Sequence, residues 1–122
     1  MYEISVRGHF DAAHALRGYK GKCESLHGHR FEVMVTVQAR ELNEIGISYD
    51  FTELKRHLRE VLEGMDHHNL NETPPFDKVN PSSENLAATL YREMASRLRD
   101  APVALARVQV WESPEASATY SL

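Results

Sequence analysis

The sequence contains a single cysteine, Cys23, among its 122 residues. One cysteine cannot close a disulfide within the chain, so we expect a reducing, cytoplasmic location. No apolar run is long enough to cross a bilayer, and the first residues lack the apolar stretch of a secretory signal. We therefore expect no membrane partner.

Excess positive charge is also missing. The 14 lysines and arginines are outnumbered by 18 aspartates and glutamates, which gives a formal net charge of −4. This balance argues against a general nucleic-acid binder, although a local basic pocket is compatible with it. Internal repeats, low-complexity tracts and long linkers are absent as well. We expect one domain over residues 1–122, large enough to bury a core.

Histidine, by contrast, is abundant, with seven in the chain. Residues 2–14 alternate between apolar and polar side chains, which is typical of a strand, and His14 has the phase of the apolar set. A second predicted strand runs from about 27 to 40, where His27 and His29 share the phase of the apolar side chains. Two histidines at i and i+2 on a strand project side by side, as a metal ion requires.

Two helices and two further strands follow. Apolar stripes with helical spacing predict helices over residues 50–65 and 83–99. Alternation and a turn at Ser113-Pro114-Glu115 predict strands over 105–112 and 117–122. The order ββααββ indicates an α+β domain, an antiparallel sheet with two helices on one face.

His14, His27 and His29 are candidate zinc ligands. Three imidazoles with one open position are typical of catalytic zinc, because the open position admits water or substrate. Alternatively, His14 is an ordinary core histidine and His-Gly-His is a turn. The shared apolar phase favours the metal, since unliganded imidazoles there would need other partners. A structural site with Cys23 as fourth ligand stays open on spacing alone.

The stretch "MDHHNLN", residues 65–71, offers Cys23 other partners. A cysteine that transfers protons needs a base, and the base needs an orienting carboxylate, roles that His67 and Asp66 could fill. Such a triad requires the preceding helix to break, because neighbouring side chains diverge on an ideal helix. The alternative is a solvated helix end whose histidines complement the helix dipole.

Glu112 shares the inward parity of Val108 and Val110, so its carboxylate lies at the end of an apolar face. It could hold a ligand with two adjacent N–H donors, or form a salt bridge at a frayed strand end. Ser82, Ser83 and Glu84 stand at the predicted start of the second helix, where ordinary N-capping also explains them.

In this order, the motifs resemble those of the 6-pyruvoyltetrahydropterin synthase superfamily, and most closely its bacterial 6-carboxytetrahydropterin synthase branch. Each motif is modest, and the ordered set is specific. The resemblance covers nearly the whole chain through "FDAAHAL", "CESLHGHRF", "YDFTELK", "MDHHNLN", "NPSSENLA" and "VWESPEASATY".

The resemblance implies the tunnelling fold, in which sheets join into a barrel-forming trimer and two trimers form a homohexamer with interfacial active sites. It implies zinc on three histidines, with Cys23 a proton-transfer residue partnered by His67 and Asp66. Glu112 would hold the pterin ring, and Glu84, Ser82 and Ser83 would line the same pocket. The zinc ligands would be His14, His27 and His29.

The implied reaction converts 7,8-dihydroneopterin triphosphate to 6-carboxytetrahydropterin, acetaldehyde and triphosphate, a step toward queuosine and hence tRNA modification. The three residues between Cys23 and His27 match the carboxy-forming branch. Arg17, Lys20 and Lys22 are candidate triphosphate contacts. Alternatives are a pyruvoyl-forming synthase, which eliminates triphosphate without carbon–carbon cleavage, a non-catalytic zinc module, and a pterin-binding protein without activity.

Overall fold

The computed structural model describes residues 1–21 and 25–122, so Cys23 and Lys22 lie outside the described residues. Five strands form one sheet in the order β3-β1-β2-β4-β5. The short β3 is parallel to β1, and the other neighbours are antiparallel. The elements are β1 (Tyr2–His14), β2 (His27–Ala39), α1 (Phe51–Glu63), β3 (His68–Asn69), the 3-10 helix η2 (Leu70–Glu72), α2 (Ser83–Arg97), β4 (Ala104–Ser113) and β5 (Ala116–Tyr120).

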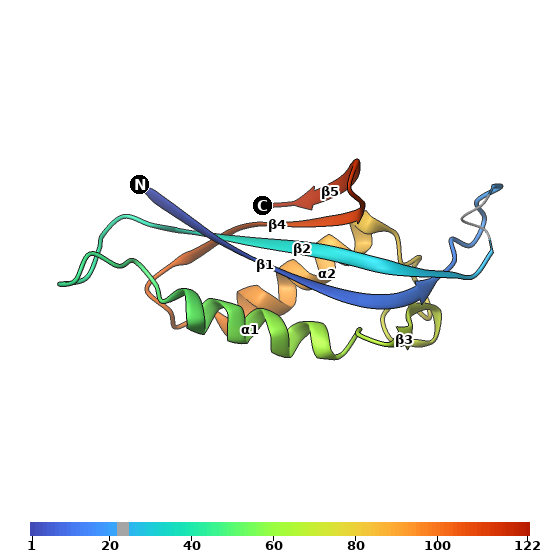
Figure 1. The fold of residues 1–122 in the computed structure, drawn as a ribbon, viewed down its shortest axis with the longest axis horizontal. Helices are drawn as coiled ribbons and strands as arrows, with labels where there is room; N and C mark the ends of the chain where they lie inside the picture. Colours follow the sequence, from blue (N-terminus) through green and yellow to red (C-terminus); the bar gives the residue numbers. More distant parts are fainter. Residues whose placement is uncertain (22–24) are drawn as a thin grey trace.

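The predicted α+β architecture is confirmed. Both helices lie on one side of the sheet (Figure 1), and they close a single core with its buried face. Strands β1 and β2 pair along their whole length, from Tyr2–Ala39 to His14–His27. Phe10 and Phe31 stack at a centroid distance of 4.9 Å within this core.

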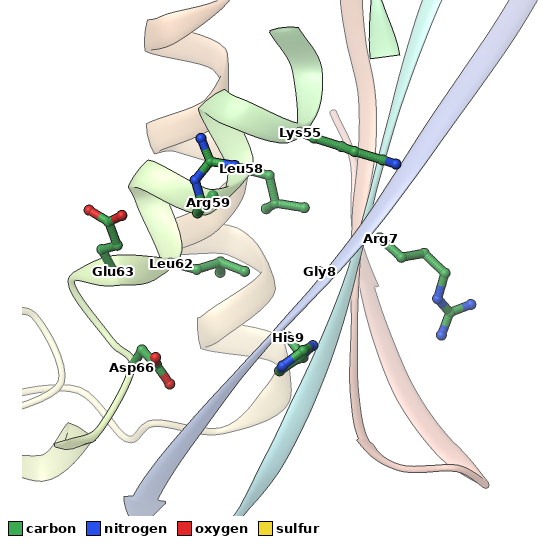
Figure 2. Close-up of a pocket in the computed structure, with 9 residues that line it drawn as sticks. All are labelled: Arg7, Gly8, His9, Lys55, Leu58, Arg59, Leu62, Glu63 and Asp66. Carbon is green, nitrogen blue, oxygen red and sulfur yellow. The ribbon is translucent and has the colours of Figure 1, made fainter. Parts of the chain in front are cut away.

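Helix α1 approaches β1 at Gly8. A Cβ placed on Gly8 would lie 3.1 Å from a methyl carbon of Leu58 and 3.2 Å from one of Leu62. Figure 2 shows these leucines pointing from α1 toward the strand. The missing side chain therefore lets the helix lie close to the sheet. Among the described residues, neither helix combines the length and hydropathy needed to cross a membrane.

The chain beyond α1 differs from expectation. The helix was predicted to reach Met65, but it ends at Glu63 and the chain turns sharply. His67 takes a left-handed backbone conformation with φ of 60°, which is uncommon for any residue except glycine. His68 and Asn69 then pair with Ala12 and Ala13 of β1 as the two-residue β3. This break is the one that an Asp66–His67 contact requires.

Candidate active site

The paired ends of β1 and β2 bring three histidines together. His14 faces His27 directly across the two strands, and His29 lies two residues further along β2, opposite Ala12. The His14 ring centroid lies 4.7 Å from that of His27 and 4.9 Å from that of His29. Antiparallel pairing thus converts a separation of 13 or 15 residues in sequence into side-chain contact.

His14 is fully buried, with 0% of its surface exposed. Burial lowers the pKa of His14, so the imidazole is neutral near pH 7. Its Nδ1–H donates to the carbonyl oxygen of Pro81 at 2.8 Å. A carbonyl can only accept, so the proton is on Nδ1 and Nε2 presents a lone pair. His27 has the same arrangement, because its Nδ1 donates to the carbonyl oxygen of Ser25 at 2.8 Å.

His29 completes the three. Its Nε2 lies 2.9 Å from Nε2 of His14, and its buried Nδ1 finds no hydrogen-bond partner among the described residues. Without a cation, His29 must protonate Nε2 to meet the lone pair of His14, which leaves Nδ1 unsatisfied at a cost. A bound cation lets both Nε2 atoms act as ligands and frees the proton for Nδ1.

Glu112 adds a carboxylate to the same point. Strand β4 has a register irregularity against β5 between Trp111 and Ser113, and such bulges often re-aim a side chain next to a site. Oε1 of Glu112 lies 3.1 Å from Nε2 of His14 and 3.6 Å from Nε2 of His29. Ligand atoms of His14, His27, His29 and Glu112 all lie within 4.8 Å of one another.

This donor set fits a metal ion. Neutral imidazoles and a carboxylate are the ligands of zinc and of several other divalent transition metals. The Pro81 and Ser25 carbonyls fix two rings in the ligating tautomer, as outer-shell partners do in metal sites. Phe31 forms an apolar wall, with its ring centroid 4.2 Å from that of His29. The four residues could therefore hold a metal ion.

A second polar group forms where the chain turns after α1. Nδ1 of His67 lies 3.0 Å from Oδ2 of Asp66, while Oδ1 of Asp66 accepts from the backbone N–H of Asp11 at 2.9 Å. That backbone donor holds the pKa of Asp66 below its usual range. The side chain of His67 is 79% exposed, so it is open to an incoming group.

His29 and His67 both line one open cavity of about 460 Å³, together with Asp11 and Arg30. The structure nevertheless places His67 outside the histidine–glutamate cluster. Cys23, the third member of the predicted triad, lies outside the described residues.

The predicted substrate residues lie at a different opening. Ser83, Glu84 and Glu112 line a cavity of about 420 Å³ between the start of α2 and β5. Ser82 instead caps α2, because its hydroxyl accepts from the N–H of Asn85 at 3.1 Å. Among the described residues, Glu112 alone belongs both to this cavity and to the histidine cluster.

Arg17, a candidate triphosphate contact, has another use. Its guanidinium donates to the backbone carbonyl oxygens of Asn71, Phe76 and Val79. These bonds tie the segment before α2 to the end of β1. Sequence reasoning also missed the cross-strand pair of Asp11 and Arg30, in which both carboxylate oxygens accept from the guanidinium. Only the β1–β2 register, which follows from the matched apolar phases, could have suggested that pair.

Comparison with known proteins identifies the family to which the chain is related. The family model described as 6-pyruvoyl tetrahydropterin synthase matches residues 3–122. The 6-carboxy-5,6,7,8-tetrahydropterin synthase of Synechocystis sp. is 36% identical over 126 residues, covering 98% of this chain and 93% of its own. The dihydroneopterin monophosphate aldolase of Pyrococcus furiosus is 36% identical over 112 residues, covering 92% and 90%. The solved structure of Caenorhabditis elegans 6-pyruvoyl tetrahydropterin synthase has a TM-score of 0.87 at 28% identity, covering 98% and 94%.

Proposed function

The chain belongs to the 6-pyruvoyl tetrahydropterin synthase family, and from this premise we propose that it is a zinc-dependent 6-carboxytetrahydropterin synthase. It would convert 7,8-dihydroneopterin triphosphate and one water molecule to 6-carboxy-5,6,7,8-tetrahydropterin, acetaldehyde and triphosphate in the cytoplasm, toward queuosine. The observation that carries the proposal is the cluster of three imidazoles and Glu112 beside a cavity. Its support is the 36% identity with the Synechocystis synthase over 98% of the chain.

His14, His27 and His29 would hold the zinc. When bound, the ion supplies a Lewis acid that lowers the pKa of substrate hydroxyls and stabilises developing negative charge. Glu112, with its side chain 34% exposed, would accept two N–H bonds from the pterin edge and orient it. Ser83 and Glu84 line the same cavity and would confine the ring, which reduces the entropic part of the barrier.

Proton transfer would fall to His67 and Cys23. Asp66 accepts from Nδ1 of His67, so the lone pair on Nε2 is free to take a proton from the substrate or from the thiol. Because the His67 ring is open to an incoming group, a Cys23 side chain from the same or another copy would complete the pair.

The proposed assembly is a homohexamer of two trimers. Strand β3 covers β1 only at Ala12 and Ala13, so residues 2–11 of β1 form an open outer edge within the described part of the chain. A cavity of about 410 Å³ borders this edge between β1 and α1 (Figure 2). Addition of a strand from a second copy would satisfy the edge and extend the sheet toward a closed barrel.

A product assay tests the proposal. The zinc-loaded protein is incubated with 7,8-dihydroneopterin triphosphate, and acetaldehyde is quantified beside the pterin product. We expect acetaldehyde and 6-carboxytetrahydropterin in equal amounts. Full consumption of substrate with a pyruvoyl product and no acetaldehyde would identify the pyruvoyl-forming reaction instead.

Dihydroneopterin monophosphate aldolase activity is a second candidate, favoured by the 36% identity with the Pyrococcus furiosus protein. The same assay distinguishes it when the monophosphate is offered in parallel. The proposed synthase should prefer the triphosphate. Turnover of the monophosphate alone would assign the aldolase reaction.

A further inference from the structure

Two carboxylates compete for one imidazole at the turn after α1. Ligand atoms of Asp11, Asp66 and His67 all lie within 4.8 Å of one another. In the structure His67 is paired with Asp66, at 3.0 Å between Nδ1 and Oδ2. A choice between two nearby acceptors would otherwise give the ring two orientations, whereas the proposed proton transfer needs one fixed position of Nε2.

The carboxylate of Asp11 is occupied by Arg30. These residues face each other across β1 and β2. Nε of Arg30 donates to Oδ1 of Asp11 at 3.0 Å, and a terminal nitrogen donates to Oδ2 at 3.1 Å. This is a two-pronged contact, the geometry in which guanidinium and carboxylate bind with most directionality. Each oxygen of Asp11 thus already accepts one hydrogen bond, and the guanidinium charge offsets the attraction of the carboxylate for His67.

The backbone of Asp11 holds Asp66 and His67 in place. Its N–H donates to Oδ1 of Asp66 at 2.9 Å, and its carbonyl oxygen accepts from the N–H of His67 at 2.6 Å. The turn is thus tied to β1 at two points while His67 is held in its left-handed conformation. The neighbouring His68 is also engaged, because its Nδ1 donates to the carbonyl oxygen of Asp66 at 2.7 Å.

We propose that the ion pair of Asp11 and Arg30 is a positioning device that confines the His67 imidazole to Asp66. Arg30 engages the competing carboxylate of Asp11, and the ring keeps its hydrogen bond to Asp66 and one orientation. The proposal rests on the proposed function in one respect, namely that His67 transfers protons during turnover.

A double-mutant cycle tests this role. Arg30→Met frees the carboxylate of Asp11, so we expect kcat to fall about 10-fold or more, with KM changed less than about 2-fold. Removing the competitor as well, in Asp11→Ala/Arg30→Met, should bring kcat back to within about 3-fold of the parent enzyme. Arg30→Lys should be intermediate, since an ammonium cannot make the two-pronged contact.

The control is Arg97→Met. It breaks an ion pair between the two helices, Arg97–Glu60 at 2.6 Å, and should leave kcat unchanged. Metal content and melting temperature are recorded for every variant. A double variant no better than Arg30→Met would reduce the ion pair to a structural contact. A rise in KM in place of the fall in kcat would make Arg30 a substrate contact, and either result overturns the proposal.

Nitrogen-15 NMR of the imidazoles separates this proposal from the proposed function. The parent protein should show one environment for His67, with the proton on Nδ1, and Arg30→Met should show a second environment that the double variant loses. If the parent protein turned over no pterin substrate, the proposed function would fail. The spectrum would still show whether the ion pair of Asp11 and Arg30 fixes the orientation of His67. A single His67 environment in all three proteins would refute the positioning role.

Discussion

The Nε2 atoms of His14 and His29 face each other at 2.9 Å. One of them presents a lone pair, because His14 donates its only ring proton to the carbonyl oxygen of Pro81. The other belongs to a ring whose remaining nitrogen is buried without a partner among the described residues. Such a pair is strained by unmet hydrogen bonding until a cation lies between the rings and Glu112.

His29→Ala should remove the metal. The variant loses one of the imidazole ligands, so affinity should fall by more than the roughly 10–100-fold that loss of an outer-shell partner costs. Metal per chain, measured by plasma mass spectrometry after dialysis, should drop from about one to a small fraction. The metal-free protein should be no less stable than its parent, because the substitution also deletes the unpartnered Nδ1.

His9→Ala is the control, since His9 is exposed on the neighbouring strand β1 and outside the cluster. Full metal retention in His29→Ala would contradict the site.

Cys23→Ala should leave zinc in place and abolish most turnover. A proton-transfer group contributes about 10²–10⁴-fold to rate, so kcat should fall by that range while metal content stays near one per chain. Coupled loss of zinc and of thermal stability would mean that Cys23 is the fourth ligand of a structural site.

Glu112→Gln should weaken substrate binding and spare the metal. The amide keeps the volume of the side chain but loses charge-assisted acceptance from the pterin edge, worth about 1.5–3 kcal/mol, or roughly 10–100-fold in KM. Glu115→Gln, in the exposed turn between β4 and β5, should change nothing. Loss of metal at unchanged KM would show instead that Glu112 is a ligand, as its 3.1 Å approach to His14 also permits.

His57 should make the protein less stable in mild acid. Burial lowers the pKa of the half-buried His57, and Arg56 and Arg97 lower it further. The folded state therefore binds this proton less readily than the unfolded chain, so its contribution is present above about pH 6.5 and is lost as the pH falls. In His57→Leu, urea unfolding between pH 7 and pH 5 should show a shallower loss of stability.

The slope of the free energy of unfolding against pH should differ between the parent and His57→Leu by less than about 1.4 kcal/mol per pH unit, because one proton on a partly solvated side chain is involved. Equal slopes for the parent and His57→Leu would show that His57 does not contribute to the loss of stability in mild acid.

Gly8→Val should destabilise the fold by about 1–3 kcal/mol, because the new methyl groups meet Leu58 and Leu62, which already lie 3.1 and 3.2 Å from the first added carbon. Gly28→Ala is the comparison. Its added carbon would lie 3.8 Å from the nearest atom, the carbonyl oxygen of Ala12, an ordinary contact. Chemical unfolding should show little change there, and equal losses at both positions would contradict the packing at Gly8.

Alternation along the first two strands was enough to predict β1 and β2 over their full lengths, and to place His14, His27 and His29 on one face. The alternation of side chains along a strand is a local property of the sequence, so it can be predicted without knowing which strands pair. The helices were also predicted, although α1 and α2 each end two residues earlier than expected.

Features that depend on distant partners were not predictable in the same way. The two residues of β3 have no strand pattern of their own and exist because β1 offers a free edge at Ala12 and Ala13. The approach of Glu112 to His14 depends on a register irregularity near the end of β4. The contact of Arg30 with Asp11 depends on the pairing of two strands.

The thirteen-residue pairing of β1 with β2 fixes the positions of the three histidines independently of the segment that connects the two strands. All three histidines are fixed by strands whose remaining length is anchored in the hydrophobic core. Apart from the Ser25 carbonyl that orients His27, no described residue of the connection between these strands takes part in the ligand cluster, so beyond that residue the connection can vary in length and sequence while the ligand positions are preserved. A fold built in this way can diversify its chemistry by changing one connecting segment, and it offers protein engineers the same freedom.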